Sequence, residues 1–270
     1  MDALHAKKER LAAALKSLGK TAVAFSAGVD STFLLAVAHE TLGDNLLALT
    51  AKVSASPQSE MNEAEAFCRA RGIRHAVVEI NQLAIEGFRQ NPPNRCYICK
   101  LFIFNELLKT AAGHGIGNVC EGSNADDVNV YRPGLRAIAE LGIHSPLRDA
   151  GLSKRDIRLL SKEMGLSTWN KPSMACLATR FEYGDLLTAE KLSMVEKAEQ
   201  RLHELGFQQV RVRCHGKLAR IEIEPFAPRI LHHRREIDSY LRELGFSYVT
   251  LDLGGYRSGS MDKALPSNMQ

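Results

Sequence analysis

Apolar and polar positions in the first part of the chain form short continuous apolar runs, separated by longer stretches with helical spacing. The apolar runs predict buried strands, because a strand that is covered on both faces needs no polar alternation. The stretches between them predict helices that pack on the two faces of an open parallel sheet. Strands are expected at residues 21–25, 45–50, 74–80 and 117–121, and helices at 2–18, 32–39, 58–71, 100–112 and 153–164.

The pattern changes after about residue 186. The expected elements are a helix at 188–205, strands at 209–214 and 218–224, a helix at 228–244 and a strand at 248–252. The same Leu-Gly-Phe sequence follows both of these predicted helices and precedes a strand. Because glycine commonly ends a helix, it marks the expected end of each one. We therefore predict an α/β fold with an open parallel sheet and flanking helices, plus a small C-terminal α+β domain.

The same pattern sets the expected domain boundaries. They are 1–168 for the sheet domain, 169–185 for a connecting loop, 186–257 for a small α-β-β-α-β domain and 258–270 for a tail.

Composition narrows the class of protein. The chain has 270 residues, of which 45% are hydrophobic and 24% charged, as in ordinary globular proteins. No apolar run approaches membrane-spanning length, and the first ten residues lack the apolar core of a signal peptide, so a cytoplasmic location is expected. A formal net charge of +4 suits a small anionic substrate as well as RNA.

A turn of small residues joins the first predicted strand to the helix after it, with the sequence Ser26-Ala27-Gly28-Val29-Asp30-Ser31. Small residues let backbone N–H groups close around an anion at a helix N-terminus. Asp30 would repel phosphate, unless it holds Mg²⁺ that bridges phosphate oxygens. The alternative interpretation is an ordinary strand–turn–helix junction. The turn contains no lysine, so it is not a P-loop.

A second polar loop, residues 121–127, follows the fourth predicted strand. Ligands of open parallel sheets bind at the carboxyl ends of the strands, so Gly122, Asp126 and Asp127 are expected at that edge. The two aspartates could hold Mg²⁺ or orient a nucleotide, and they could equally belong to a solvated Asx-type loop.

The six cysteines are expected to be reduced in a cytoplasmic protein. Cys68 falls on a helix face and Cys120 in a strand, so both are expected to fill the core. Cys96 and Cys99 form a C-x-x-C pair in a predicted loop, which alone could be half a zinc site, a redox pair or a coincidence.

Cys176 lies in a predicted irregular loop between Lys171 and Arg180. Nearby cations favour the thiolate, which is the reactive and metal-binding form. If Cys176 converges with Cys96 and Cys99, the three thiols supply three of the four ligands of an iron–sulfur cluster. A plain buried cysteine is the alternative.

Arg211 and Arg213 alternate along one predicted strand, so their side chains share a face. Two guanidinium groups on one face suit a phosphate monoester. Glu222 and Glu224 alternate likewise on the next strand, so a solvated outer face with cross-strand charge pairs is the competing interpretation.

The 26–31 turn resembles the S-G-G-x-D-S loop of PP-loop ATP pyrophosphatases, with Ala27 in place of the first glycine. Together with segments 121–127, 171–180 and 210–213 it resembles the LarE-type sulfur transferases of nickel-pincer cofactor biosynthesis. The resemblance covers residues 1 to about 255 and implies an adenine nucleotide alpha hydrolase-like fold. These enzymes use ATP to adenylate a carboxylate of pyridinium-3,5-biscarboxylic acid mononucleotide, which then becomes a thiocarboxylate.

The resemblance also implies roles for particular residues. The turn, Gly122 and Asp126 would bind ATP, with Mg²⁺ at Asp30, and Asp30 and Cys176 would be catalytic. Substrate phosphate would be bound by Arg180, Arg211 and Arg213, and the sulfur-transfer site would be lined by Glu199 and Glu222.

The sulfur source differs within this family. Single-cysteine members sacrifice the sulfur of the residue matching Cys176, whereas three-cysteine members carry a four-iron–four-sulfur cluster and use added sulfide. Cys96, Cys99 and Cys176 match the second pattern. The resemblance also implies a homo-oligomer built from trimers.

Two alternatives stay open. A PP-loop tRNA thiolation enzyme with an iron–sulfur cluster would share the ATP turn and the thiols. A non-catalytic nucleotide-binding module would share the turn alone.

Overall fold

The computed structural model describes residues 3–129, 133–172, 175–225, 228–257 and 259–261. The chain forms two compact units, of which the first comprises residues 1–53, 58–81 and 96–174 and the second residues 54–57, 82–95 and 175–270. Most of the predicted tail, residue 258 and residues 262–270, lies outside the described residues, and so do residues 131 and 132.

The first unit is built on a parallel sheet, as the sequence predicts. Its strand order is β3-β2-β1-β4, and every pair is parallel. The strands are β1 (Thr21–Ala24), β2 (Leu46–Val53), β3 (His75–Ile80) and β4 (Asn118–Cys120). From β1 the chain continues to β2 and β3 on one side of the sheet, and then crosses to β4 on the other side of β1. The ends of β1 and β4 therefore flank a topological switch, where open sheets bind ligands.

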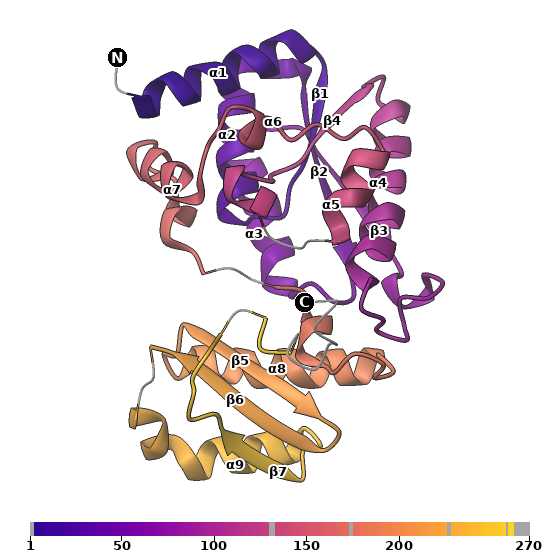
Figure 1. The fold of residues 1–270 in the computed structure, drawn as a ribbon. Helices are drawn as coiled ribbons and strands as arrows, with labels where there is room; N and C mark the ends of the chain where they lie inside the picture. The colour runs from indigo at the N-terminus through magenta and orange to yellow at the C-terminus, as the bar shows by residue number, and fades with distance from the viewer. Residues whose placement is uncertain (1–2, 130–132, 173–174, 226–227, 258, 262–270) are drawn as a thin grey trace. The chain divides into compact units, whose positions relative to one another are not determined.

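Helices cover both faces of this sheet (Figure 1). Val23 and Ala48 pack in one apolar cluster, while their neighbours Ala22 and Leu47 pack in another, as alternation along a strand requires. The first cluster includes residues of α1 (Ala3–Leu18), α2 (Val29–Leu42), α3 (Gln58–Ala70), α6 (Pro146–Asp149) and α7 (Lys154–Glu163). The second includes residues of α4 (Arg95–Gly113) and α5 (Pro133–Glu140).

Two predictions for this unit were wrong. Helix α4 begins at Arg95 rather than at residue 100, so Cys96 and Cys99 lie in its first turns and not in a loop. The Arg95 N–H donates to the Pro92 carbonyl, so the chain turns directly from the prolines into the helix. Helix α5 was not predicted, because Pro133 reads as a loop residue although proline is also favoured at the first position of a helix.

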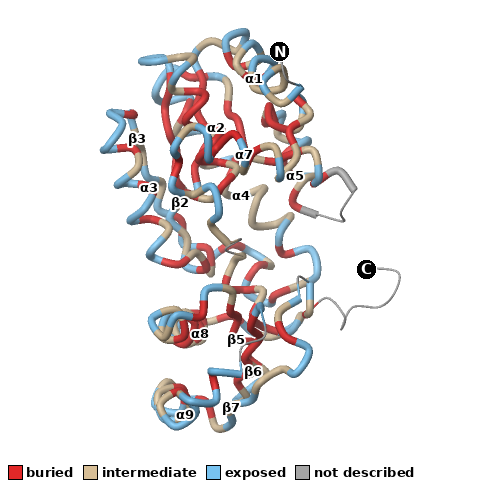
Figure 2. Tube along the Cα trace, turned by 90° about the vertical axis from the view of Figure 1, so that its left-hand side faces the viewer, coloured by how far each residue is buried: buried red, intermediate tan, exposed pale blue. Residues whose placement is uncertain are grey.

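The second unit carries the predicted α-β-β-α-β order. Its elements are α8 (Ala189–Glu204), β5 (Gln209–His215), β6 (Leu218–Glu224), α9 (Arg234–Glu243) and β7 (Tyr248–Leu251). Strand β6 is central, antiparallel to β5 and parallel to β7, and most residues of β5 and β6 are buried (Figure 2). Residues 228–233 form a 3₁₀ turn rather than the start of α9. In the described part of the chain, no helix combines the length and apolarity needed to span a membrane.

Candidate functional site

The turn between β1 and α2 is braced by its own serines. The Ser26 hydroxyl lies 3.0 Å from the Ser31 hydroxyl, and the Ser26 N–H donates to Ser31 Oγ over 3.3 Å. Ser31 Oγ in turn donates to the Gly28 carbonyl at 3.3 Å. Because α2 starts at Val29, its first N–H groups have no partner within the helix and give this end partial positive charge. The geometry is that of an anion-binding helix N-terminus.

Ala27 has a left-handed backbone, with φ of 53°. For a residue with a Cβ this conformation costs roughly 1–2 kcal/mol, whereas glycine adopts it freely. Ala27 is the position at which the S-G-G-x-D-S loops carry their first glycine. Alanine at this position therefore carries a local strain that glycine would not.

The loop after β4 lies against the start of α2. A Cβ on Gly122 would come within 3.1 Å of the Ser31 nitrogen and 3.4 Å of Asp30 Cβ. The buried Glu121 carboxylate fixes this loop by accepting from the Ser123 N–H (3.0 Å), the Ser123 hydroxyl (2.8 Å) and the Ser145 hydroxyl (2.6 Å). The structure thus brings the two predicted loops together at one edge of the sheet.

Asp30 is the acidic centre of this edge. Its Oδ2 accepts from Lys154 Nζ at 2.5 Å, and its buried Oδ1 has no hydrogen-bond partner among the described residues. Burial raises the pKa of Asp30, Lys154 opposes that shift, and the nearby Asp127 carboxylate adds to it. A carboxylate oxygen without a partner at an anion-binding turn fits a magnesium ligand, since Mg²⁺ prefers oxygen donors.

Two lysines reach the turn from distant parts of the chain, which the sequence did not reveal. Lys154 comes from the first turn of α7, and Lys171 donates from Nζ to the Ala27 carbonyl at 3.1 Å. Lys171 Nζ also lies 2.6 Å from Glu63 Oε2. The serine N-cap correctly predicted the start of α7. It gives no information on which part of the chain this helix packs against. Positive charge is therefore present at a turn that contains no lysine of its own.

Asp126 and Asp127 have different surroundings. Asp126 is exposed, donates its N–H to Asn124 Oδ1 (2.9 Å) and accepts from the Lys154 N–H (2.8 Å), so it shapes an Asx-type loop and caps α7. Asp127 is buried, accepts from the Asn124 N–H at 3.0 Å and acts electrostatically on Asp30. Of the pair, Asp127 is the one whose charge bears on Asp30.

The predicted arginines of the second unit are buried, and Arg180 and Arg213 form ion pairs. Arg180 Nε and Nη2 lie 2.8 and 2.7 Å from the two oxygens of Glu199, and neither side chain is more than 5% exposed. Arg213 Nε and Nη2 both donate to Glu222 Oε2, at 3.0 and 2.9 Å. Arg211 is also buried, and burial together with the charge of Arg180 lowers its pKa. The face of β5 that carries Arg211 and Arg213 is buried rather than a solvated outer surface, although the cross-strand charge pair of the competing interpretation is present between Arg213 and Glu222.

Cys176 is followed by a 3₁₀ helix, Leu177–Arg180, rather than by an irregular loop, and its backbone is held at several points. Arg180 Nη1 donates to the Ala175 carbonyl (2.8 Å) and the Cys176 carbonyl (3.2 Å), and the Thr179 hydroxyl donates to the Cys176 carbonyl (2.8 Å). Arg180 therefore acts on the backbone of Cys176. The other expected cation, Lys171, belongs to the first unit, where it pairs with Glu63.

The thiols divide into two kinds. Cys68 and Cys120 are buried, and burial raises the pKa of each to about 12, which confirms them as core residues. Cys96 is exposed and Cys99 half-buried, and their spacing places both on one side of α4. Cys176, also half-buried, belongs to the second unit. Within the described ranges, no group of three or more His, Cys, Asp or Glu residues is placed to hold a metal ion.

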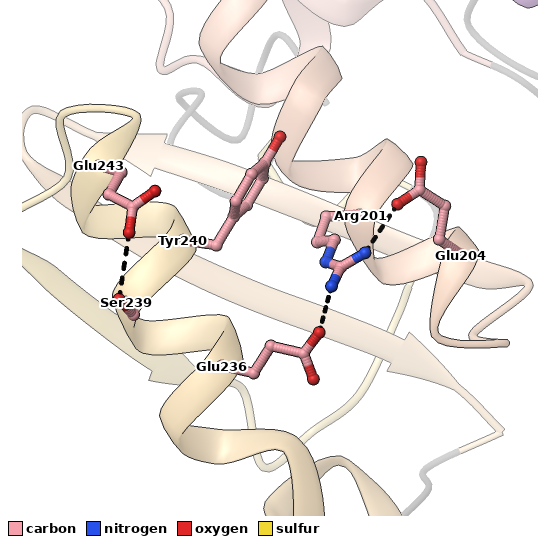
Figure 3. Close-up of a pocket in the computed structure, with 6 residues that line it drawn as sticks. All are labelled: Arg201, Glu204, Glu236, Ser239, Tyr240 and Glu243. Atoms are coloured by element: carbon pink, nitrogen blue, oxygen red, sulfur yellow. Dashed lines mark hydrogen bonds and ion pairs between the residues drawn. The ribbon is translucent and has the colours of Figure 1, made fainter.

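A surface pocket of about 390 Å³ lies between α8 and α9. Arg201 occupies its centre between Glu204 and Glu236, and Ser239 donates to Glu243 at 3.2 Å (Figure 3). Arg201 thus pairs with both Glu204 and Glu236, and none of the predicted site residues lines the pocket.

Comparison with known proteins found relatives that match almost the whole chain. A pyridinium-3,5-bisthiocarboxylic acid mononucleotide synthase of Lactiplantibacillus plantarum is 39% identical over 267 residues, which is 98% of this chain and 97% of the relative. An uncharacterized protein of Synechocystis sp. is 40% identical over 97% of this chain and 99% of its own length. No family model matches the chain.

A more distant relative matches about two thirds of the chain. This glutamine-hydrolyzing GMP synthase component of Thermoplasma acidophilum is 27% identical over 199 residues, which is 68% of this chain and 63% of the relative. The similarity agrees with a PP-loop fold for the four-stranded parallel sheet and its helices.

Proposed function

Because the chain belongs to the family of pyridinium-3,5-bisthiocarboxylic acid mononucleotide synthases, we propose that it is an ATP-dependent sulfurtransferase of nickel-pincer nucleotide cofactor biosynthesis. Its substrate would be pyridinium-3,5-biscarboxylic acid mononucleotide. A carboxylate of that substrate would be adenylated, with release of pyrophosphate, and then converted into a thiocarboxylate.

The observation that carries the proposal is the braced turn with Asp30 at its centre. It combines the first N–H groups of α2, which have no partner within the helix, with a carboxylate whose Oδ1 is buried and has no hydrogen-bond partner among the described residues. The first feature suits a phosphate anion and the second suits a cation that accompanies it. The two features together suit ATP with bound magnesium better than they suit a phosphate without a metal ion or a metal ion without a phosphate.

A carboxylate has no good leaving group, so it must be activated before sulfur can replace oxygen. In the proposed first step the substrate carboxylate attacks the α-phosphorus of ATP, and the bond to pyrophosphate breaks. The 26–31 turn would hold the pyrophosphate, and Lys154 would keep Asp30 ionised. Magnesium bound at Asp30 would neutralise charge on the leaving group.

In the second step a sulfur nucleophile attacks the acyl adenylate, and AMP leaves with the former carboxylate oxygen. Cys176 would supply or hold this sulfur. Arg180, Arg211 and Arg213 would recognise the substrate phosphate, and Glu199 and Glu222 would line the sulfur-transfer site. The pairing of Arg180 with Glu199 and of Arg213 with Glu222 supports a shared role for these groups.

We further propose that Cys96, Cys99 and Cys176 ligate a four-iron–four-sulfur cluster. Cys96 is exposed and Cys99 half-buried, and both lie on one side of α4. Cysteine thiolates are the usual ligands of iron–sulfur clusters. When bound, the cluster would present sulfide from an external donor. A cytoplasmic, trimer-based homo-oligomer completes the proposal.

The test is an anaerobic assay with ATP, Mg²⁺, sulfide and the mononucleotide. Pyrophosphate release that depends on the mononucleotide, together with a product heavier by the exchange of oxygen for sulfur, would support the proposal. Pyrophosphate release with tRNA instead, with binding that weakens steeply as salt rises, would favour the tRNA thiolation alternative. Tight ATP binding without pyrophosphate release for any acceptor would favour a nucleotide-binding module.

A further inference from the structure

We infer that Lys171 is a positioning residue that holds the ATP turn in its left-handed conformation and so compensates for alanine at position 27. The inference rests on the proposed function, because it concerns how the turn is made competent to bind ATP. It assigns Lys171 to the backbone of the turn rather than to the phosphates.

The strain at Ala27 needs an external restraint. With φ of 53°, Ala27 adopts a conformation that its side chain disfavours. Its two neighbours are held by hydrogen bonds among Ser26, Gly28 and Ser31, and the Gly28 carbonyl also accepts from the Thr32 N–H at 2.9 Å. None of those bonds involves Ala27 itself. Lys171 Nζ supplies the missing contact by donating to the Ala27 carbonyl over 3.1 Å.

Lys171 is suited to this task because it is fixed at both ends. Its ammonium group is paired with Glu63 over 2.6 Å, and its side chain is 16% exposed. Its backbone carbonyl accepts from Arg158 Nη2 at 2.9 Å, and the other guanidinium nitrogen donates to the Trp169 carbonyl at 2.8 Å. A donor held in this way can restrain a carbonyl direction, which a free surface lysine could not do.

The inference predicts that the need for Lys171 depends on the residue at position 27. Glycine adopts the left-handed conformation without strain, so a turn with glycine at this position would not need the restraint. A lysine that contacts ATP directly would be needed equally with either residue. Positioning and direct binding therefore differ in a double-mutant cycle.

The experiment compares wild type, Ala27→Gly, Lys171→Met and the double variant. The quantity measured is kcat/KM for ATP in pyrophosphate release. Lys171→Met is expected to lower it about tenfold when residue 27 is alanine, which matches the strain of a left-handed L-residue. In the Ala27→Gly background the same change is expected to cost no more than about twofold. Lys171→Arg, which keeps a donor, should retain most of the activity.

An equal loss in both backgrounds would overturn the inference and indicate direct contact between Lys171 and ATP. No loss in either background would overturn it as well. If Lys171→Met fails to fold, Glu63→Gln releases the same ammonium group from its anchor and should show the same dependence on residue 27. If wild type releases no pyrophosphate, the proposed function fails, and the ATP dissociation constants of the four proteins still test the inference.

Discussion

Lys154 Nζ lies 2.5 Å from Asp30 Oδ2, although the two residues are 124 positions apart in the chain. The carboxylate best suited to magnesium is therefore paired with an ammonium group in this structure. Burial alone would favour the protonated acid, and Lys154 counteracts that effect. The lysine opposes protonation of Asp30, while the neighbouring Oδ1 has no hydrogen-bond partner among the described residues.

Asp30→Asn is expected to stabilise the fold at neutral pH and to abolish pyrophosphate release. Burial raises the pKa of Asp30 above its ordinary value of 3.8, so the native state holds this proton more tightly than the unfolded chain. The contribution of Asp30 to stability is thus fully present below that ordinary value and is lost as pH rises through the raised native pKa. Asparagine does not titrate and so has no such loss. The Tm of the variant minus that of wild type should therefore increase from acidic to neutral pH. A Tm difference that does not vary with pH would contradict this.

Gly122→Ala should impair ATP use while leaving the fold intact. The added methyl would meet the Ser31 nitrogen at 3.1 Å, which forces the 121–127 loop away from the start of α2. We expect a loss of about tenfold in kcat/KM for ATP and a stability cost of about 1 kcal/mol. Gly117→Ala is the matched control, because a Cβ there meets nothing within 4 Å. Equal activity of the two variants would argue against close packing of this loop at the site.

Asp30→Ala and Cys176→Ala should separate the two chemical steps. Without Asp30 the leaving pyrophosphate lacks its magnesium ligand, so neither pyrophosphate nor thiocarboxylate should form. Without the Cys176 thiol, pyrophosphate release should persist while thiocarboxylate formation stops. Both products are measured in single-turnover reactions with the mononucleotide. Loss of pyrophosphate release in Cys176→Ala would refute this division of labour.

Anaerobically purified protein should contain about four iron and four acid-labile sulfide per chain. Cys96→Ala should lose both, because one of the three protein ligands is removed. Cys68→Ala is a suitable control, since that thiol is buried in the core. Protein that is free of metal and still thiolates the mononucleotide would identify Cys176 itself as the sulfur donor.

The sheet could be predicted from the sequence because most residues of β1, β2 and β4 are buried, and continuous apolar runs mark such strands clearly. The edge strand β3 is less buried and was recognised from its run of apolar residues alone. The start of α4 and the whole of α5 could not, because proline precedes helices as readily as it interrupts them. Thus the C-x-x-C pair was placed in a loop although it lies on a helix.

The site was predictable only where its residues are adjacent in the chain. The 26–31 turn and the 121–127 loop follow strands, and the parallel topology brings those strand ends together. Lys154 and Lys171 reach the same place through tertiary packing, which leaves no local pattern. The strained backbone of Ala27 was equally hidden, since alanine is not a residue that signals a left-handed turn.

Arg180 forms two sets of hydrogen bonds that a bound phosphate would disturb. One side of its guanidinium group is taken by Glu199, and the other holds the Ala175 and Cys176 carbonyls. A substrate phosphate that binds Arg180 must exchange with one of these partners. If it exchanges with the carbonyls, binding of the mononucleotide would at the same time free the backbone of the Cys176 segment, so substrate binding and movement of that segment would be coupled through one guanidinium group.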